Sequence, residues 1–388
     1  MILRYNKIIA ENKKYLFWLA YVMYLAELLF FSSMYGELDS LQMIFAGVRN
    51  ISYLLICTKI LLDFVYGKYS KRECALIIVI TALMILSAKS AGNKSMLIYW
   101  TFIVAARDIE LEEIVKAAIM IHLCCMLIII ASCVGGIIED RVYMQGVDRN
   151  RLSLGYQYTT DSSNYFFHII LMYIYIKRDK ISWESIGVLT LCNILLFKLT
   201  DTKSAFLLGI FALFVATIMK IFRSMRNNNV IYKAGAVLVV PVMSGIMICL
   251  SSFCDGKIQW LTSLDKILNG RLTLGYNAFN TYGIHFWGKS IQWIGGTRDY
   301  IENSGEYNYV DSSYIQILLS YGVVFFLFVC LLFIVLGWKA AKMNDIYLIM
   351  ILSVIAIHSA FDPQLLWMAF NPFIMCYSYL RKKDLVLL

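Results

Sequence analysis

The sequence predicts an all-α integral membrane protein, and three observations lead to this fold class. Of the 388 residues, 60% are hydrophobic and only 16% are charged, whereas a soluble domain is about 45–50% apolar and about 25% charged. The mean hydropathy is +0.68. The apolar residues also form runs bounded by charge, and about 20 residues per run is the length that crosses a bilayer as a helix. About twelve such spans would use most of the hydrophobic residues, which excludes a soluble enzyme with one anchor, a disordered chain and a β-barrel of short alternating segments.

In chain order, the apolar runs predict the following helices: 15 to 31, 41 to 66, 74 to 88, 95 to 106, 114 to 137, 165 to 176, 183 to 199, 204 to 221, 230 to 252, 313 to 337, 345 to 360 and 363 to 380. The runs at 95 to 106 and 165 to 176 are short for a full crossing. Pro241 and Pro372 lie inside runs and predict kinks. The whole chain, 1 to 388, is expected to be a single polytopic membrane domain.

The basic residues predict the orientation of these spans. If the N-terminus is cytoplasmic, 21 of the 35 Lys and Arg residues lie in cytoplasmic segments and 12 in outer segments, although the outer loops are longer. Cytoplasmic loops retain Lys and Arg, so both termini are predicted to be cytoplasmic. The net charge of +9 then arises from the basic residues that face anionic lipid on the cytoplasmic side. Nucleic acid is therefore not expected as a partner.

Cysteine and histidine give little evidence of a cross-linked or metal-binding protein. Most of the ten cysteines lie in predicted spans, and the four histidines are scattered along the chain. Neither a disulfide framework nor a metal site is expected from this pattern.

Two outer segments, 138 to 164 and 253 to 312, are much longer than the other connections. Long loops in a compact protein are usually functional or disordered. The second is rich in aromatic residues and contains an amphipathic stretch near Trp260, so it is expected to contain short helices that lie on the outer membrane surface.

The two outer loops share a heptapeptide. Residues 151 to 157 read RLSLGYQ and residues 271 to 277 read RLTLGYN, and each loop ends in Asp-Ser-Ser. One interpretation is structural, with Asp161 and Asp311 as helix N-caps and the arginines snorkelling at the interface. The functional interpretation is that Arg151 and Arg271 converge on an anion at the membrane face.

One familiar motif is rejected. Residues 283 to 290, GIHFWGKS, satisfy the pattern GxxxxGK[ST]. A phosphate-binding loop needs a preceding buried strand and small residues around its backbone amides. The bulky interior of this segment and its place in an outer loop therefore exclude an ATP site.

Several short motifs together resemble the Wzy polysaccharide polymerases of bacterial capsule and O-antigen synthesis, a group related to the O-antigen ligases. They are the R-x-S-x-G segment at 151, TDTKSAFL at 200 to 207, NGRL at 269 to 272 and VDSSYIQILLSYG at 310 to 322. The ligase signature places a His eleven positions or so before a Gly; here Asp311 stands at that position before Gly322, which favours a polymerase over a ligase.

The resemblance implies a metal-independent, inverting glycosyltransferase of GT-C-like fold that needs no cofactor. It would transfer a glycan from undecaprenyl diphosphate onto a new lipid-linked repeat unit at the outer face of the bacterial cytoplasmic membrane. Its expected partners are the undecaprenyl-diphosphate-linked oligosaccharide and membrane lipid, and they could include a flippase and a chain-length regulator of the same pathway.

Within this hypothesis Asp311 accepts the proton of the acceptor hydroxyl, while Arg151 and Arg271 hold the diphosphate through charge-assisted contacts. His285 is an alternative base. Further candidates for binding the phosphates are Arg149, Arg298 and Lys203, and candidates for stacking on sugar are Tyr156, Tyr276, Trp287 and Trp293. Three alternatives stay open: a ligase, a scaffold, and a flippase or transporter for lipid-linked oligosaccharide, which would have broken helices in its spans.

Overall fold

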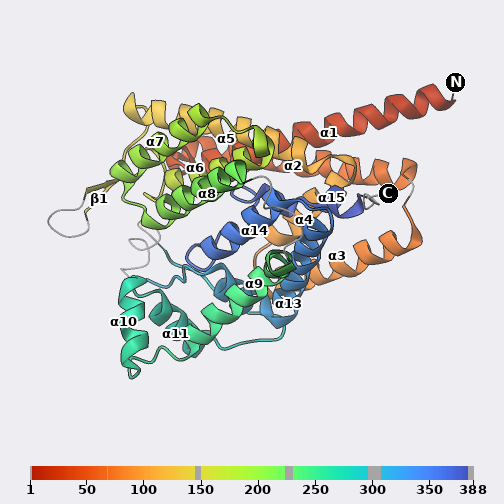
Figure 1. Ribbon diagram of the computed structural model, residues 1–388. Coiled ribbons are helices and arrows are strands. Elements are labelled where there is room, and N and C mark those ends of the chain that lie inside the picture. Colours follow the sequence, from red (N-terminus) through yellow and green to blue (C-terminus); the bar gives the residue numbers. More distant parts are fainter. Residues whose placement is uncertain (1, 68, 145–149, 223–229, 296–306, 383–388) are drawn as a thin grey trace. The chain divides into compact units, whose positions relative to one another are not determined.

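The computed structural model describes residues 2–67, 69–144, 150–222, 230–295 and 307–382. The chain is an all-α membrane protein (Figure 1), with 76% of its residues in helices. Among the described residues, seven helices are long and apolar enough to cross a membrane. The coarse fold class predicted from the composition is therefore confirmed.

The helices and strands have these bounds: α1 Ile2–Phe31, η1 Met34–Glu37, α2 Asp39–Tyr66, α3 Lys71–Ala91, α4 Ser95–Ala105, η2 Ala106–Asp108, α5 Leu111–Val134, β1 Val142–Met144, β2 Asn150–Leu152, α6 Asp161–Lys177, η3 Arg178–Lys180, α7 Trp183–Thr200, α8 Lys203–Ile221, α9 Val230–Ser252, α10 Gln259–Ile267, α11 Arg271–Tyr282, α13 Ser313–Lys342, α14 Ile346–His358, η5 Pro372–Ile374 and α15 Tyr377–Arg381. The strands β1 and β2 form an antiparallel hairpin in the first outer loop, with Tyr143 opposite Arg151.

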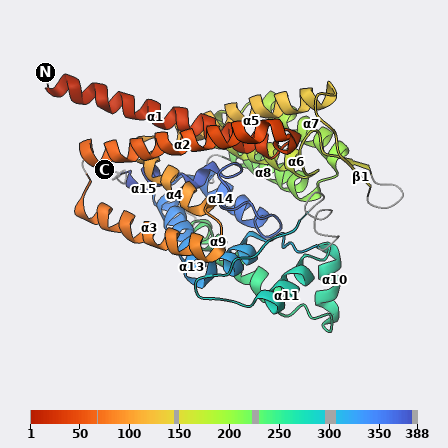
Figure 2. The same cartoon turned by 180° about the vertical axis from the view of Figure 1, so that it is seen from behind.

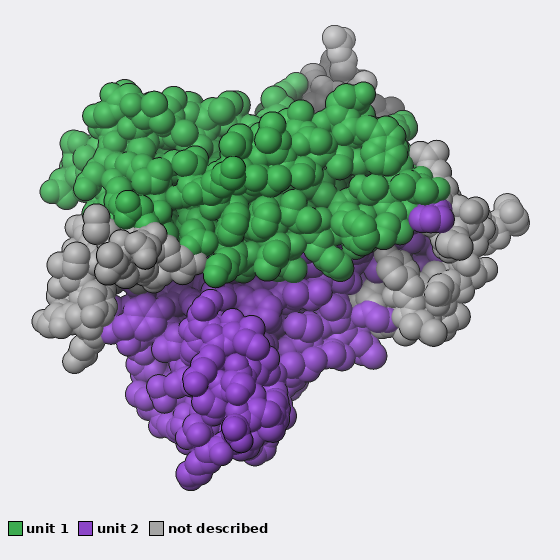
Figure 3. Space-filling view, turned by 60° about the vertical axis from the view of Figure 1, so that its left-hand side comes forward, with its two compact units in different colours: residues 1–78, 98–221, 368–383 green, residues 79–97, 222–367, 384–388 purple. Residues whose placement is uncertain are grey.

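The contacts divide the chain into two compact units (Figure 3). Unit 1 comprises residues 1–78, 98–221 and 368–383, and unit 2 comprises residues 79–97, 222–367 and 384–388. Because the chain passes between the units several times, no linker in the sequence marks the division.

Each unit is a set of helices packed on their neighbours. In unit 1, α1 lies along α2 in both ribbon views (Figures 1 and 2) and also packs on α5, while α6 contacts α5, α7 and α8. In unit 2, α9 contacts α11, α13 and α14, and α10 packs on α11. The long outer loop thus contains helices α10 and α11, as its aromatic content predicts.

The predicted helix at 363 to 380 is wrong. Residues 359 to 376 are irregular apart from the short η5, and nearly all of them are buried. Pro363 and Pro372 explain this, because proline removes a backbone donor and clashes with the preceding helical turn; Pro372 begins η5 instead of kinking a helix, and Asn371 caps it through Phe373 N–H at 3.2 Å. Irregular backbone is tolerated at membrane depth where protein covers it, so an apolar run was mistaken for a helix.

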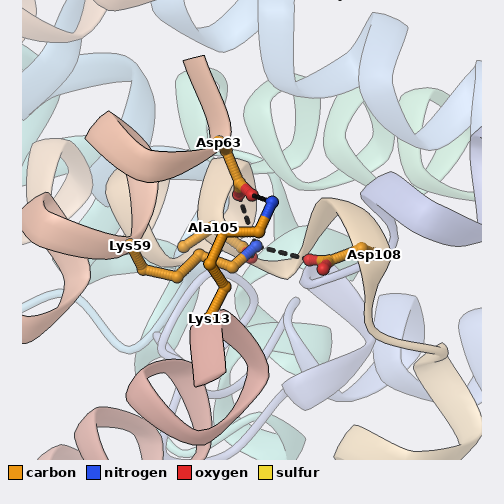
Figure 4. Close-up of polar contacts among 5 residues, drawn as sticks. All are labelled: Lys13, Lys59, Asp63, Ala105 and Asp108. Carbon is orange, nitrogen blue, oxygen red and sulfur yellow. Dashed lines mark hydrogen bonds and ion pairs between the residues drawn. The ribbon is translucent and has the colours of Figure 1, made fainter. Parts of the chain in front are cut away.

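Unit 1 contains a buried cluster of charges that links four helical elements, α1, α2, α4 and η2 (Figure 4). Lys59 of α2 is fully buried and its Nζ contacts Asp63 Oδ2 at 2.5 Å, the Ala105 carbonyl at 2.5 Å, and the Asp108 carboxylate. Lys13 of α1 reaches the other oxygen of Asp63 at 2.8 Å. Two lysines and two aspartates thus neutralise one another, which makes their burial tolerable.

Three ion pairs in unit 1 join segments that the sequence places on the same side of the membrane. Arg381 contacts Glu73 at 2.8 Å and Lys382 contacts Glu110 at 3.1 Å, so the end of the chain lies beside loops that the sequence places in the cytoplasm. Segments predicted to be outside likewise meet one another, since Arg141 pairs with Glu37. The side of the membrane on which each end lies stays a prediction.

Candidate functional site

Arg271 and Asp311 form an ion pair in unit 2, within the long outer loop. Arg271 Nε donates to Asp311 Oδ2 at 3.2 Å, and the two side chains are 22% and 28% exposed. The pair joins the first residue of α11 to the chain just before α13. This much exposure leaves both groups open to a ligand, which a structural pair in the core would not be.

Local backbone chemistry places Arg271 at the start of α11. Gly270 adopts φ +80°, which glycine tolerates best. The Asp265 carboxylate then accepts hydrogen bonds from Leu272 N–H at 2.7 Å and Thr273 N–H at 3.3 Å, which satisfies free amides of the first turn. The helix therefore begins where the guanidinium can reach Asp311.

Asp311 is not the N-cap of α13, which was the structural alternative for this residue. Ser312 occupies the cap position, and the helix begins at Ser313. Because the carboxylate of Asp311 contacts Arg271 instead, it remains available for chemistry. At the other Asp-Ser-Ser segment, Asp161 is the first residue of α6.

The surroundings of Asp311 shift the pKa of its carboxyl. Burial raises the pKa of the carboxyl above its ordinary value, the negative charge of Asp362 raises it further, and the Arg271 guanidinium opposes both. A carboxylate with a raised pKa is a stronger base than an ordinary aspartate. The site therefore has the character required of a general base.

Three more residues around this pair were missed by the sequence analysis. Partial burial and the Asp311 carboxylate raise the pKa of Tyr307 to about 12, so its hydroxyl keeps its proton at neutral pH. Asp362 follows α14 and lies 3.2 Å from the buried His358, measured from Oδ2 to Nε2. These residues lie far from Arg271 in the chain, and no motif pointed to them.

The residues that follow α14 contact both Arg271 and the start of α13. The guanidinium carbon of Arg271 lies 5.9 Å from the centre of the Phe361 ring. Ser313 N–H donates to the Ser359 carbonyl at 2.9 Å, and Ser313 Oγ donates to the Asp362 carbonyl at 2.7 Å. These bonds fix the start of α13, and therefore Asp311, against the loop that carries Asp362.

The helix α13 is broken at Gly322, where φ is +86° and ψ is 173°. The loop segment after α11 supplies the missing backbone partners. Val323 N–H donates to the His285 carbonyl at 3.1 Å, Val324 N–H to the Phe286 carbonyl at 3.2 Å, and Lys289 N–H to the Leu319 and Ser320 carbonyls at 3.2 Å. The GIHFWGKS segment is thus a backbone bridge across a helix break, which agrees with rejecting it as a phosphate loop.

The residues of this segment that were predicted to bind substrate are exposed. His285 Nε2 lies 2.9 Å from the Tyr282 carbonyl, and the ring is exposed. Trp287 is 41% exposed and contacts Phe286, while Tyr276 on α11 is half-buried. In the described part of the chain, no hydrogen bond, ion pair or ring contact joins these three side chains to the Arg271–Asp311 pair.

The remaining predicted residues lie in unit 1 or outside the described residues. Arg151 is on β2, and its Nε donates to the Thr200 carbonyl at 2.8 Å; Lys203 begins α8 and is exposed. Tyr156 is only 1% exposed and packs on Tyr165, so it is a core residue rather than a sugar platform. Arg149 and Arg298 lie outside the described residues. Since Arg151 and Arg271 belong to different units, their convergence on one anion stays a prediction.

No family model, no curated protein and no solved structure matches this chain in the three comparisons made. The function must therefore be argued from the residues of the site.

Proposed function

We propose that this protein is a glycosyltransferase that polymerises undecaprenyl-diphosphate-linked repeat units at the outer face of the bacterial cytoplasmic membrane. The observation that carries the proposal is the accessible Arg271–Asp311 pair, in which a cation and a base lie 3.2 Å apart. The resemblance to the Wzy polymerases supports it, and a GT-C-like fold with both termini in the cytoplasm belongs to the same proposal.

In the proposed reaction Asp311 takes the proton from a hydroxyl of the acceptor sugar. The hydroxyl oxygen forms a bond to the anomeric carbon of the donor, and the bond from that carbon to the diphosphate oxygen breaks. The diphosphate leaves with the electron pair of that bond, and Arg271 stabilises its charge. A single displacement of this kind inverts the configuration of the anomeric carbon.

The ion pair explains how one site can both bind the diphosphate and supply the base. In the absence of substrate, the two side chains satisfy each other across a partly exposed contact. A diphosphate carries more negative charge than a single carboxylate, so it can displace Asp311 from Arg271. Displacement leaves the carboxylate without its cation, and its basicity rises as the substrate binds.

A direct test compares Asp311→Asn and Arg271→Gln with the wild type in proteoliposomes that contain the lipid-linked repeat unit. We expect each variant to lower the rate of chain growth by about 10² to 10⁴. Asp255→Asn is the matched control, because Asp255 forms an exposed pair with Lys257 in the same loop, at 3.4 Å. Chain growth at the wild-type rate in both site variants would refute the proposal.

A transporter for the same lipid-linked oligosaccharide is the second candidate, because broken helices are typical of transporters and α13 is broken at Gly322. The two functions separate in cells that carry the site variants. Single repeat units that reach the outer surface but are not joined support a polymerase, whereas accumulation of units on the inner face supports a transporter.

A further inference from the structure

Unit 2 contains a cavity of about 200 Å³ beside the first half of α13. One wall is a single face of this helix, since Ser313, Gln316 and Ser320 line it at helical spacing. The segment with Trp293, the connection between α3 and α4 with Asn93, and the loop after Asp362 form the other walls. A cavity of about 150 Å³ is known to hold a benzene-sized molecule, so this one has room for a single six-membered sugar ring.

The described residues that line the cavity carry no formal charge. They include no Asp, Glu, Lys, Arg or His; their polar groups are hydroxyls and amides, and the largest apolar surfaces are Trp293, Tyr309, Tyr321 and Trp367. Hydroxyl and amide groups can pair with sugar hydroxyls, and aromatic faces can cover the C–H face of the ring. An anionic ligand would lose its hydration there without gaining a cation, which is costly.

Hydrogen bonds hold the lining in place before any ligand binds. Trp293 Nε1 donates to Ser320 Oγ at 3.0 Å, and the indole meets the Tyr309 ring edge to face at 6.5 Å. Gln316 Nε2 donates to the Val310 carbonyl at 2.8 Å. A ligand therefore finds an ordered surface, which lowers the entropy cost of binding.

The cavity also adjoins the proposed base along the chain. Tyr309 and Ser313 both line it, and they lie two residues before and two residues after Asp311. A sugar in the cavity would therefore lie close to the carboxylate that accepts a proton from the acceptor.

We propose that this cavity is a subsite for one uncharged sugar of the acceptor, a hexose or an N-acetylhexosamine, and that it excludes uronic acids. This inference rests on the proposed function for the identity of the ligand as acceptor. Its specificity for a neutral ring rests only on the lining of the cavity.

The test is ligand-observed NMR with the full-length protein in nanodiscs, with methyl N-acetylglucosaminide and methyl glucoside as neutral probes and methyl glucuronide as the acidic probe. We expect the neutral probes to bind and the acidic probe not to bind. Trp293→Phe removes the bond to Ser320 and Gln316→Leu removes the amide, and each should weaken binding of a neutral probe about three- to tenfold. Trp260→Phe is the matched control, because Trp260 lies on α10 and is 62% exposed.

The NMR experiment measures sugar binding and requires no glycosyl transfer, so it tests the subsite separately from the proposed function. Binding of the neutral probes to the inactive Asp311→Asn variant supports the subsite. If chain growth survives in the Asp311 and Arg271 variants while the neutral probes still bind at Trp293, the proposed function fails and the subsite stands. Equal binding of the glucuronide, unchanged binding in both cavity variants, or displacement of lipid signals with no sugar bound would overturn the subsite.

Discussion

Gly288 and Gly322 meet backbone to backbone where the outer loop crosses the break in α13. A Cβ added to Gly288 would overlap the backbone of Ser320 and Tyr321, and one added to Gly322 would overlap Gly288 and Trp287, all at well under 3.0 Å. Both glycines also have φ near +86°. The part of α13 after the break, Val323–Lys342, is about 30 Å long, which alone matches the hydrocarbon core. The contact therefore fixes the segment 283 to 290 at the break in α13.

Replacing either glycine by alanine should destabilise the protein. The left-handed conformation costs an alanine about 1–2 kcal/mol, and relief of the overlap adds about 1–3 kcal/mol. We expect Gly288→Ala and Gly322→Ala to lower the thermal unfolding midpoint of the purified protein in detergent. Gly245→Ala in α9 is the control, because nothing lies within 4 Å of its added Cβ, and alanine is favoured in a helix. Wild-type midpoints in both loop variants would show that the backbone contact is not formed.

The apolar runs predicted most of the helices because crossing a membrane requires a long apolar helix, a constraint visible in any single run. The helix predicted for residues 363 to 380 is wrong because the irregular backbone of residues 359 to 376 is covered by neighbouring parts of the protein. A sequence pattern does not show such coverage. Such a segment is as apolar as a helix and differs from one chiefly in Pro363 and Pro372.

The two copies of the shared heptapeptide have similar sequences but different backbone conformations. Residues 271 to 277 begin the helix α11, whereas Arg151 and Leu152 end a strand and Leu154 and Gly155 turn with φ of +55° and +81°. In both copies an upstream aspartate binds the third residue, since Asp140 accepts from Ser153 N–H and Oγ, and Asp265 accepts from Thr273 N–H and Oγ. Similar peptide sequences and the same aspartate contact are therefore compatible with both backbone conformations.

Arg271 and Asp311 were both named from the sequence, but their pairing was not. They lie 40 residues apart, and only the fold brings them together. Glu27 of α1 and Arg49 of α2 also form a pair between two helices, with Arg49 Nε 3.1 Å from Glu27 Oε1. The partners of such charges depend on how the helices pack.

Removal of the Lys59 charge should destabilise unit 1. Lys59→Met leaves Asp63 and Asp108 without their shared cation, and loss of one partner of a buried charge cluster typically costs about 3–5 kcal/mol. Lys116→Met is the matched control, because Lys116 forms an exposed pair with Glu112 at 2.7 Å, and such pairs contribute about 0–1 kcal/mol. The thermal midpoints of the two variants should differ clearly; equal midpoints would mean that the cluster in Figure 4 is solvated.

Asp311→Asn should lower the rate of chain growth by about 10² to 10⁴ without destabilising the protein. The raised pKa means that the folded protein favours the neutral carboxyl, so the charge opposes folding at pH values above the ordinary pKa and the penalty is complete above the raised one. Asparagine is neutral at every pH and avoids this penalty, although Arg271 loses its partner. We expect a thermal midpoint at pH 7.5 equal to or above that of the wild type. A much lower midpoint would assign Asp311 a structural role.

The pH dependence of chain growth tests whether Asp362 sets the basicity of Asp311. The reaction requires the carboxylate, so the rate falls as the pH drops through the raised pKa of Asp311, and the acidic limb of kcat/KM should lie above the ordinary pKa of 3.8. Asp362→Asn removes a negative charge that raises this pKa, whereas Arg271 continues to lower it. The acidic limb should therefore move to lower pH, with a smaller maximal rate because the base is weaker. Asp255→Asn should leave the limb unchanged, since Asp255 contributes nothing to the Asp311 pKa. A limb that stays in place in Asp362→Asn, or moves to higher pH, would show that another group limits the rate.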